Sequence, residues 1–344
     1  MDDGRPGEQL YAVLAAKRRQ ITLAVLITGG TGQIGSFLCQ SLLRSGEEVI
    51  IYDVKPNMEN IKAFKDRVRL VEGDILDRNQ MVETIRKYGV KSVYHLAAVV
   101  VIESRENPVK SASVNCLGTA NVFEACRLAD VERVVFTSSS AVIGRPDSYQ
   151  KSVVTEDDVP HCPPDPYSAT KVMNEVFGQH YYSRFGLKTL CLRISAGWGP
   201  GRYVGFTGVF NDMIRKLARG EPASLPQDFA YSKAPLRWVY VEELGDCLAF
   251  AGRVDEAKIR RRLYNVGTRR PFTPVEFVAM LKQILPDARL QAEWRDKPTE
   301  SALNVAGPSG LDFDCTRFYD ELGYKETLGL RESLERAIAF ERAA

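Results

Sequence analysis

Several classes of site are disfavoured by what the sequence lacks. The 344 residues include three histidines and seven cysteines, and no two cysteines form a Cys-x-x-Cys pair. A histidine cluster, a zinc motif or a redox motif is therefore not expected, and we predict no metal site. The odd number of cysteines and their wide spacing favour reduced, mostly buried thiols. This cysteine usage predicts a cytoplasmic protein.

The charge balance and the short hydrophobic runs argue against nucleic acid and membranes as partners. Lys and Arg total 46 and Asp and Glu total 44, so the net charge is +2. No basic face for nucleic acid or for a membrane surface is expected from this balance. The apolar run at residues 21–27 is too short to span a bilayer and leads directly into glycines. We interpret that run as a strand and not as a signal peptide.

Short apolar runs alternate with helical patterns through the first half of the chain. The predicted strands cover residues 23–27, 48–52, 68–72, 92–96, 133–138 and 188–194. The predicted helices cover residues 34–45, 81–88, 108–128 and 168–185. Strands that alternate with helices form right-handed βαβ units and a parallel sheet covered on both faces. The predicted fold class is α/β, with a doubly wound parallel sheet of the Rossmann type.

A glycine-rich turn joins the first predicted strand to the first predicted helix. Gly29, Gly32 and Gly35 have the spacing G-x-x-G-x-x-G. Such a turn lets the backbone approach a pyrophosphate, and the helix start offers free N–H groups near Gln33 and Ile34. The alternative is a glycine-rich turn without a ligand, which the strand–turn–helix context disfavours. The turn therefore predicts dinucleotide binding.

Asp53 ends the second predicted strand, roughly 20 residues after Gly35, where an acidic residue meets the ribose hydroxyls of NAD. A carboxylate at this place repels a 2′-phosphate, so NAD is favoured over NADP as the cofactor. Lys55 lies close by in the sequence and acts against that preference. The alternative is a solvated loop aspartate.

The chain changes character after Gly197. Glycine and proline cluster at residues 197–201, and helical patterns follow at 209–219, 274–285 and 330–340, with a strand at 238–241. We predict an N-terminal extension (1–20), an NAD-binding Rossmann domain (21–197) and a smaller substrate-binding lobe (198–344). Residues 238–253 are expected to be able to return to the first domain.

Tyr167 and Lys171 form a Tyr-x-x-x-Lys pair, and their spacing places both side chains on one face of a helix. A nearby ammonium favours the phenolate and is expected to lower the pKa of the tyrosine. Tyr167 would then exchange a proton with a substrate hydroxyl while a hydride moves to or from nicotinamide. The alternative is an ordinary solvated pair on a helix surface.

Three serines, Ser138, Ser139 and Ser140, end the fifth predicted strand. Open α/β sheets bind ligands at the carboxyl ends of their strands, so a hydroxyl here can hold a substrate oxygen beside the tyrosine. The alternative is a polar loop without such a role.

Taken in order, these motifs resemble the extended short-chain dehydrogenase/reductases, the NAD-dependent epimerase/dehydratase family. The resemblance covers residues from about 23 to about 341. Further matching segments are Gly73-Asp74-Ile75, His95-Leu96-Ala97-Ala98, Asn115 with Gly118-Thr119, Leu192-Arg193, residues 237–241, and Asp314 with Leu322-Gly323-Tyr324.

The resemblance implies a role for individual positions. Asp74 and Ile75 would meet adenine, and Leu96, Ala97 and Ala98 would line the cofactor cleft. The catalytic hydroxyl would be that of Ser139, Lys171 would also bind the nicotinamide ribose, and Asn115 would support the catalytic site. Substrate contacts would come from Ser139, Ser140 and Arg237, the last at the position of a family arginine that grips a diphosphate.

The sequence also departs from the family pattern. Dehydratases of the family carry an Asp-Glu pair after the catalytic hydroxyl residue, and decarboxylating members keep a glutamate at the second place. Here Ser140 and Ala141 stand there, so neither elimination nor decarboxylation is expected. Ala196 replaces an asparagine usual in nucleotide-sugar enzymes, and Arg295-Asp296 is only a loose counterpart of a second arginine motif.

Three functions therefore remain open. The first is an NAD-dependent oxidoreductase or epimerase that acts on a secondary hydroxyl of a sugar or nucleotide sugar. The second is a dehydrogenase of a secondary alcohol without a nucleotide, such as a hydroxy acid, a uronate or a sterol-like molecule. The third, a non-enzymatic NAD sensor, is disfavoured by Tyr167 and Lys171. The helices at 108–128 and 168–185 resemble the pair that forms a dimeric four-helix bundle in the family, which predicts a homodimer.

Overall fold

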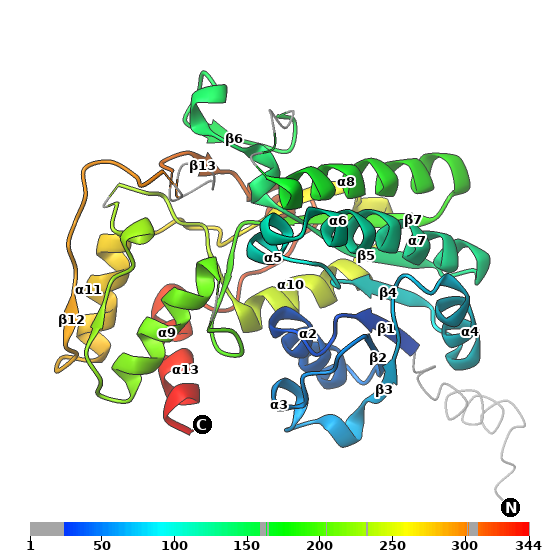
Figure 1. The fold of residues 1–344 in the computed structure, drawn as a ribbon, viewed down its shortest axis with the longest axis horizontal. Helices are drawn as coiled ribbons and strands as arrows, with labels where there is room; N and C mark the ends of the chain where they lie inside the picture. Colours follow the sequence, from blue (N-terminus) through cyan, green and yellow to red (C-terminus); the bar gives the residue numbers. More distant parts are fainter. Residues whose placement is uncertain are drawn as a thin grey trace, which may run out of the picture.

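Seven parallel strands form the central sheet of the computed structural model, in the order β11-β7-β5-β4-β1-β2-β3 (Figure 1). The strands are β1 (Ala24–Thr28), β2 (Glu48–Asp53), β3 (Arg69–Glu72), β4 (Ser92–His95), β5 (Arg133–Ser139), β7 (Lys188–Ile194) and β11 (Leu263–Val266). Every adjacent pair in this sheet is parallel. The predicted α/β class with a Rossmann-type sheet is confirmed.

The structure describes residues 24–158, 163, 165–203, 205–231, 233–300, 302 and 309–343. The predicted extension at residues 1–20, and Cys162 among the cysteines, lie outside the described residues. No helix in the described part of the chain is long and apolar enough to cross a membrane.

Helices cover both faces of the sheet (Figure 1). One face carries α4 (Arg78–Tyr88), α7 (Thr119–Leu128) and α8 (Pro166–Phe185), and the other carries α2 (Gln33–Arg44) and α10 (Val241–Arg253). All five residues of β1 are buried, which explains why this strand is a continuous apolar run. A strand covered on both faces has no solvent side on which to place polar residues.

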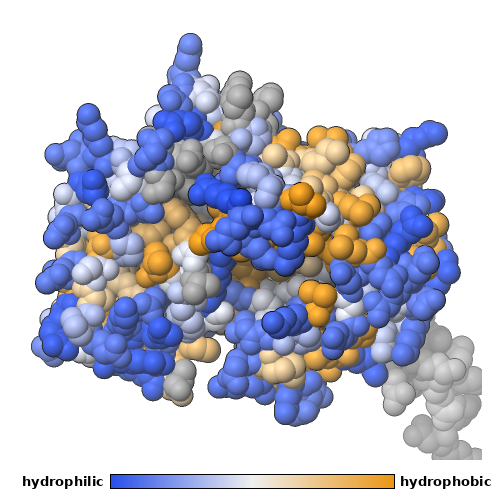
Figure 2. Space-filling model, in the orientation of Figure 1, coloured by the Kyte–Doolittle hydropathy of each residue, from blue (hydrophilic) through white to orange (hydrophobic). Residues whose placement is uncertain are grey.

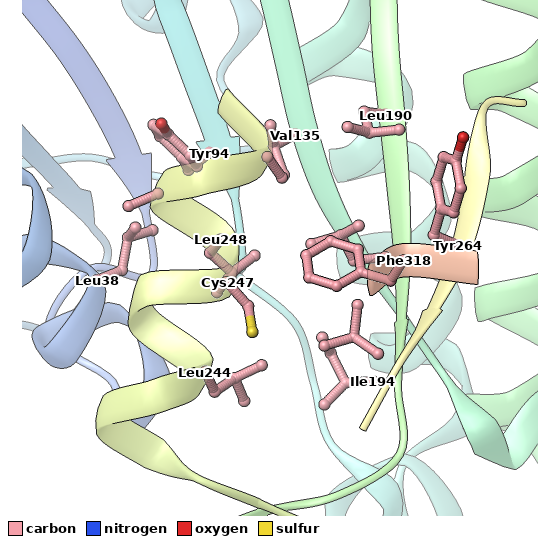
Figure 3. Close-up of a cluster of buried hydrophobic side chains, with 14 of the residues drawn as sticks. Leu38, Tyr94, Val135, Leu190, Ile194, Leu244, Cys247, Leu248, Tyr264 and Phe318 are labelled. Carbon is pink, nitrogen blue, oxygen red and sulfur yellow. The ribbon is translucent and has the colours of Figure 1, made fainter. Parts of the chain in front are cut away.

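Helix α10 packs beside α2 on the same face of the sheet, against β4 and β5. Figure 3 shows Leu244 and Cys247 of α10 directed toward Ile194 of β7 and Phe318, with Leu38 of α2 on the other side of the helix. The backbones of the two helices approach closely at Gly245, where an added Cβ would lie 2.7 Å from the carbonyl carbon of Phe37. A segment after Gly197 therefore completes the core of the sheet domain.

A second apolar core lies in the lobe formed by α9 (Phe206–Ala218), α11 (Pro274–Ile284) and α13 (Leu330–Ala343). Its centre is a set of edge-on and tilted aromatic rings: Trp198, Phe210, Phe229, Trp238 and Phe277. Short parallel pairs border it, namely β8 (Gly197–Trp198) with β10 (Val239–Tyr240) and β9 (Ala223–Ser224) with β12 (Leu290–Gln291). A third pair joins β6 (Val153–Val154) to β13 (Asp312–Phe313).

The remaining helices are short or irregular. They are α3 (Met58–Ile61), α5 (Val101–Glu106), α6 (Pro108–Ser111) and α12 (Thr316–Asp320), with 3-10 turns between them. The predicted single helix at 108–128 consists of α6, a π-helical segment (Ala112–Gly118) and α7. The π-helical turns place Asn115 within the packed interior, and π-helical insertions are frequent at functional sites.

Neither α10 nor β11 is indicated by a local pattern in the sequence. Strand β11 has only four residues, follows three consecutive arginines and contains Asn265. Its apolar character is therefore too brief to indicate a strand, and its place beside β7 depends on long-range pairing. Helix α10 begins directly after β10, where a strand was predicted through Val241.

We expect Gly245→Ala to destabilise the protein. The new methyl group must push α10 away from the backbone of α2, and overpacking of this kind typically costs about 1–3 kcal/mol. Gly329→Ala is the matched control, because nothing lies within 4 Å of a Cβ at that glycine. Thermal unfolding should give a lower Tm for Gly245→Ala alone, and equal Tm values would contradict the described packing of α10 on α2.

Candidate active site

The predicted cofactor and catalytic positions gather at one edge of the sheet. The glycine turn follows β1, Asp53 ends β2, Asp74 follows β3, Leu96 follows β4 and Ser139 ends β5. Because the strands are parallel, their carboxyl ends meet at the same edge, which is where open α/β sheets bind ligands.

At the glycines of this turn an added side chain would collide with neighbouring backbone atoms. We call the turn, residues 29–35, the glycine cradle. Gly29 has a φ of 70°, and a Cβ there would lie 2.9 Å from the Cα of Ala97. At Gly35 a Cβ would collide with the carbonyl oxygen of Gly29. Gly32 caps α2 without a side-chain hydrogen bond. The first turn of α2 therefore starts with N–H groups that no side chain caps, a setting that favours an anion.

Gln33 links this turn to the second lobe. Its side-chain amide donates to the carbonyl oxygens of Gly199 (2.6 Å) and Pro200 (3.0 Å). Ile34, the next residue of α2, is partly buried and packs against both apolar cores. The glycine turn is thus held on two sides, by the sheet and by the lobe.

Asp53 lies beside the glycine turn. One carboxylate oxygen accepts hydrogen bonds from the Thr31 hydroxyl (2.6 Å) and the Thr31 N–H (3.2 Å). The other oxygen accepts only a longer bond, from the N–H of Lys55 (3.3 Å). A partly buried carboxylate is therefore fixed next to the predicted phosphate cradle, as the binding of a cofactor ribose requires.

The remaining cofactor positions have definite local partners. The Asp74 carboxylate accepts from the N–H of Leu76 (2.9 Å), and the side chain of Ile75 is buried against Gly118. The N–H groups of Leu96 and Ala97 donate to the carbonyl and hydroxyl oxygens of Thr28, and Ala98 follows, partly exposed. The contacts of Asp74 and Ile75 with adenine stay a prediction.

Tyr167 and Lys171 stand at the start of α8, facing the end of β5. Asp165 caps the helix by accepting from the N–H and the hydroxyl of Ser168, both at 2.9 Å. The Ser139 side chain acts on the Tyr167 phenol and favours its ionised form. The Lys171 Nζ donates to the carbonyl oxygen of Thr137 (2.9 Å) and lies 5.6 Å from the centre of the Tyr167 ring.

The prediction that Lys171 lowers the pKa of the Tyr167 phenol is wrong. The pKa of Tyr167 is raised, because burial disfavours the phenolate more than the Ser139 side chain and the Arg202 charge favour it. Burial also lowers the pKa of Lys171 to about 8. The Lys171 ammonium is directed to the backbone of β5, which accounts for its small effect on the pKa of the Tyr167 phenol.

Arg202 is a functional candidate that the sequence analysis missed. It lies in the loop after β8, and its guanidinium lies over Gly205, where a Cβ would have no room. Its positive charge acts to lower the pKa of Tyr167, and the phenol in turn acts to raise the pKa of the arginine. Only its position in the Gly-Pro-Gly-Arg turn could have indicated this residue.

Asn115 holds the loop after β4 against α8. Its amide oxygen accepts from the N–H of Val99 (2.8 Å), and its amide nitrogen donates to the Val99 carbonyl (2.9 Å) and the Thr170 hydroxyl (3.1 Å). The side chain is buried. These bonds tie the loop that carries Leu96–Ala98 to the helix that carries Tyr167, so Asn115 can only support the site from behind.

Two predicted substrate contacts have other partners. The Ser140 hydroxyl is buried and donates to the carbonyl oxygen of Ser195 (2.8 Å). Arg237 is buried in a bidentate ion pair with Asp312 (2.7 and 2.8 Å), and its remaining Nη1 donates to backbone carbonyls. Both side chains are therefore engaged by other groups of the chain, and their contacts with a substrate stay a prediction.

The cofactor cradle, the fixed carboxylate and the hydroxyl–phenol–lysine group match one family of proteins. Residues 25–267 match the model of the NAD dependent epimerase/dehydratase family. The chain belongs to this family. It is therefore an NAD-dependent enzyme, and the glycine cradle and Asp53 fit that cofactor. Within the described residues no group of three or more His, Cys, Asp or Glu could hold a metal ion.

Similar proteins cover nearly the whole chain. A UDP-glucose 4-epimerase of Azospirillum brasilense is 34% identical over 338 residues, which are 93% of this chain and 92% of that protein. The structure of a Thermus thermophilus UDP-glucose 4-epimerase in complex with NAD has a TM-score of 0.73 and 26% identity, and covers 94% of this chain and all of its own. MoeE5 in complex with UDP-glucuronic acid and NAD has a TM-score of 0.72 and 28% identity, over 93% of this chain and 99% of its own.

We expect NAD to bind more tightly than NADP. The Asp53 carboxylate stands beside the phosphate cradle and repels a 2′-phosphate, so Asp53→Ala should bring the two affinities closer together. Titration of both cofactors by calorimetry measures the difference between the two affinities. Equal affinity for the two cofactors in the unmutated protein would refute this role of Asp53.

Proposed function

We propose that this enzyme is an NAD-dependent epimerase or dehydrogenase that acts on a secondary hydroxyl of a sugar or nucleotide sugar. The observation that carries the proposal is the convergence of Ser139, Tyr167 and Lys171 at the end of β5, next to the glycine cradle. The similarity to UDP-glucose 4-epimerases supports a sugar substrate. A cytoplasmic location stays a prediction from cysteine usage.

The proposed chemistry divides the work between the cofactor and the chain. NAD supplies the hydride acceptor and donor. The Tyr167 phenol exchanges a proton with the substrate hydroxyl, and the Ser139 hydroxyl, which also acts on that phenol, holds the substrate oxygen in place. Lys171 orients the site through the Thr137 carbonyl and is also proposed to bind the cofactor ribose.

The charge of Arg202 is proposed to assist Tyr167. Because burial raises the pKa of the phenol, a neighbouring cation is needed to favour proton release. Arg202 acts in that direction, and its own burial makes the interaction stronger than in water.

Elimination of water is not proposed. The positions after Ser139 hold Ser140, which is bonded to the Ser195 carbonyl, and Ala141. Neither offers a carboxyl group that could move a proton during elimination or decarboxylation, so net oxidation, reduction or epimerisation remains.

A second candidate is a dehydrogenase of a secondary alcohol that carries no nucleotide, such as a hydroxy acid, a uronate or a sterol-like molecule. The ion pair of Arg237 with Asp312 favours it, because a neutralised guanidinium has less attraction for a diphosphate. Ala196 in place of the usual asparagine favours it as well. A non-enzymatic NAD sensor is disfavoured by the presence of both Tyr167 and Lys171.

The behaviour of the cofactor distinguishes the two proposed reactions. An epimerase regenerates its NAD in every cycle and should retain it through purification. A dehydrogenase should exchange NAD and form NADH with its substrate. Incubation with sugars, nucleotide sugars and hydroxy acids, followed by NADH absorbance and by analysis of the sugar epimers, separates these outcomes.

We expect Tyr167→Phe to lower turnover by roughly 10²–10⁴-fold, the usual contribution of a positioned acid or base. NAD affinity should change little, because the glycine cradle and Asp53 supply most of it. Ser139→Ala should cost less, since a water can replace one hydrogen bond, whereas Lys171→Ala should lower both turnover and NAD affinity. Near-normal turnover of Tyr167→Phe on the true substrate would exclude this mechanism.

The outer face of the helices around α8 is apolar. Exposed apolar side chains gather there: Val109 of α6, Leu117 of the π-helical segment, and Met173, Val176 and Phe185 of α8. Figure 2 shows this apolar area over α6 and α8. Three further apolar residues of these helices, Val114, Val122 and Val172, pack inward into the cores. We propose that this surface forms a homodimer, because a monomer rarely exposes such a patch.

Light scattering at micromolar concentration should give twice the 38.4 kDa mass of one chain. Val176→Arg should shift the protein toward the monomer, because a charge in an apolar interface loses its hydration. Val275→Arg, at an exposed apolar residue of α11, is the control and should leave the mass unchanged. A monomer mass for the unmutated protein would refute the proposed interface.

A further inference from the structure

Three side chains on one face of α8 contact three consecutive residues at the end of β5. The helix residues are spaced by four, so they stand one above the other on that face. The pairs are Tyr167 with Ser139, Lys171 with the Thr137 carbonyl (2.9 Å), and Glu175 with the Ser138 hydroxyl, which donates to it at 2.6 Å. Glu175 therefore extends the predicted catalytic pair by one further turn of the helix.

The Glu175 carboxylate also binds Arg193 of the neighbouring strand β7. The arginine donates through Nε and Nη2, both at 2.7 Å. The side chain of Glu175 is 10% exposed and that of Arg193 is 4% exposed. Ser138 and Arg193 are partners in the register of β5 and β7. The carboxylate thus lies over two adjacent strands, directly before Ser139 leaves the sheet.

We propose that Glu175 is a positioning residue for the reaction, which ties the serine-bearing end of β5 and the end of β7 to the helix that carries Tyr167 and Lys171. This inference rests on the proposed function of the Ser139, Tyr167 and Lys171 group. The geometry provides the reason, because one carboxylate holds Ser138, the neighbour of Ser139, and is one helical turn from Lys171.

The same carboxylate supplies a negative charge to the surroundings of Lys171. The other titratable groups that face this lysine are Tyr167 on α8, Cys191 on β7, Cys116 in the π-helical segment and His95 on β4. Burial raises the pKa of both thiols and lowers the pKa of His95 to about 3, so these groups are uncharged near neutral pH. Glu175 is the carboxylate among these groups, and its charge acts to raise the pKa of Lys171, which is about 8.

Glu175→Gln tests the charge without removing the bulk of the side chain. Without the carboxylate the pKa of Lys171 falls, so the lysine loses its proton at lower pH. NAD affinity, measured by calorimetry between pH 6 and pH 10, should then decline at a pH lower by roughly 0.5–1 unit than in the unmutated protein. Glu175→Asp keeps the charge and should restore most of the profile. These titrations need no substrate.

Ser138→Ala tests the positioning of β5 separately. It removes one hydroxyl and leaves the Glu175–Arg193 ion pair in place, so it should lower turnover several-fold, as expected for loss of one hydrogen bond to a charged group. The pH dependence of NAD binding should not change. If Glu175→Gln fails to fold, Ser138→Ala carries the test, and normal turnover of that variant then overturns the proposed positioning.

Glu124→Gln is the matched control. Glu124 of α7 accepts from Arg127 Nε (2.9 Å) and Nη2 (2.7 Å) and from the hydroxyl of Tyr181 on α8 (3.2 Å). Like Glu175, this glutamate accepts hydrogen bonds from an arginine and from a hydroxyl, but it lies away from the proposed catalytic residues. Neither the pH dependence of NAD affinity nor turnover should therefore change.

Two results together would overturn the proposal: an unshifted NAD profile for Glu175→Gln, and normal turnover for Ser138→Ala. Glu175 would then be only a buried ion-pair partner. If instead no sugar or alcohol is turned over but the NAD profile shifts as described, the role of Glu175 toward Lys171 stands and the proposed function fails.

Discussion

The parallel pairing of β1, β4, β5 and β7 is the constraint on which the rest of the structure depends. Each strand ends at the same edge of the sheet, so the glycine cradle, the loop after β4 and Ser139 are brought together by hydrogen-bonded register alone. The register holds because helices bury both faces of these strands, and a slip by one residue would expose an entire apolar row. Helix α10, from the second half of the chain, is part of that cover. The lobe and the sheet domain are therefore joined through a shared core, and the cofactor cradle depends on both.

Burial at this edge sets the electrostatics of the candidate site. It raises the pKa of Tyr167 and lowers that of Lys171, so by itself it favours the uncharged form of each group. Ser139 and Arg202 oppose this effect at the phenol, and Glu175 opposes it at the lysine. A site that exchanges protons near neutral pH needs such opposing contributions, because a group shifted far from its working pH exchanges protons poorly. The groups around the pair are thus as much a part of the proposed chemistry as the pair itself.

Local patterns in the sequence were sufficient to predict much of the fold and part of the site. The glycine spacing, the apolar strand runs and the Tyr-x-x-x-Lys pair each lie within a few residues, so they can be recognised without a partner. Strand β11, the partner of Arg237 and the contacts of Glu175 depend on residues far apart in the sequence, such as Asp312 and Ser138. No local pattern indicates which distant residue will complete such a pair. The direction of the Tyr167 pKa was missed for the same reason, since burial is a property of the packed protein.

The chemistry and the substrate are encoded in different parts of this chain. Ser139, Tyr167 and Lys171 lie on β5 and α8, where the family motifs are most complete, so they carry the proposed hydride-transfer chemistry without indicating what enters the site. The residues that would distinguish a nucleotide sugar from a smaller alcohol lie after β7, where Ala196 departs from the usual residue and Arg237 is paired with Asp312. The Arg237 guanidinium can bind a diphosphate only if its ion pair with Asp312 is broken, and breaking that ion pair costs free energy. The ion pair of Arg237 with Asp312 therefore bears on the proposed class of substrate, whereas Ser139, Tyr167 and Lys171 bear on the proposed chemistry.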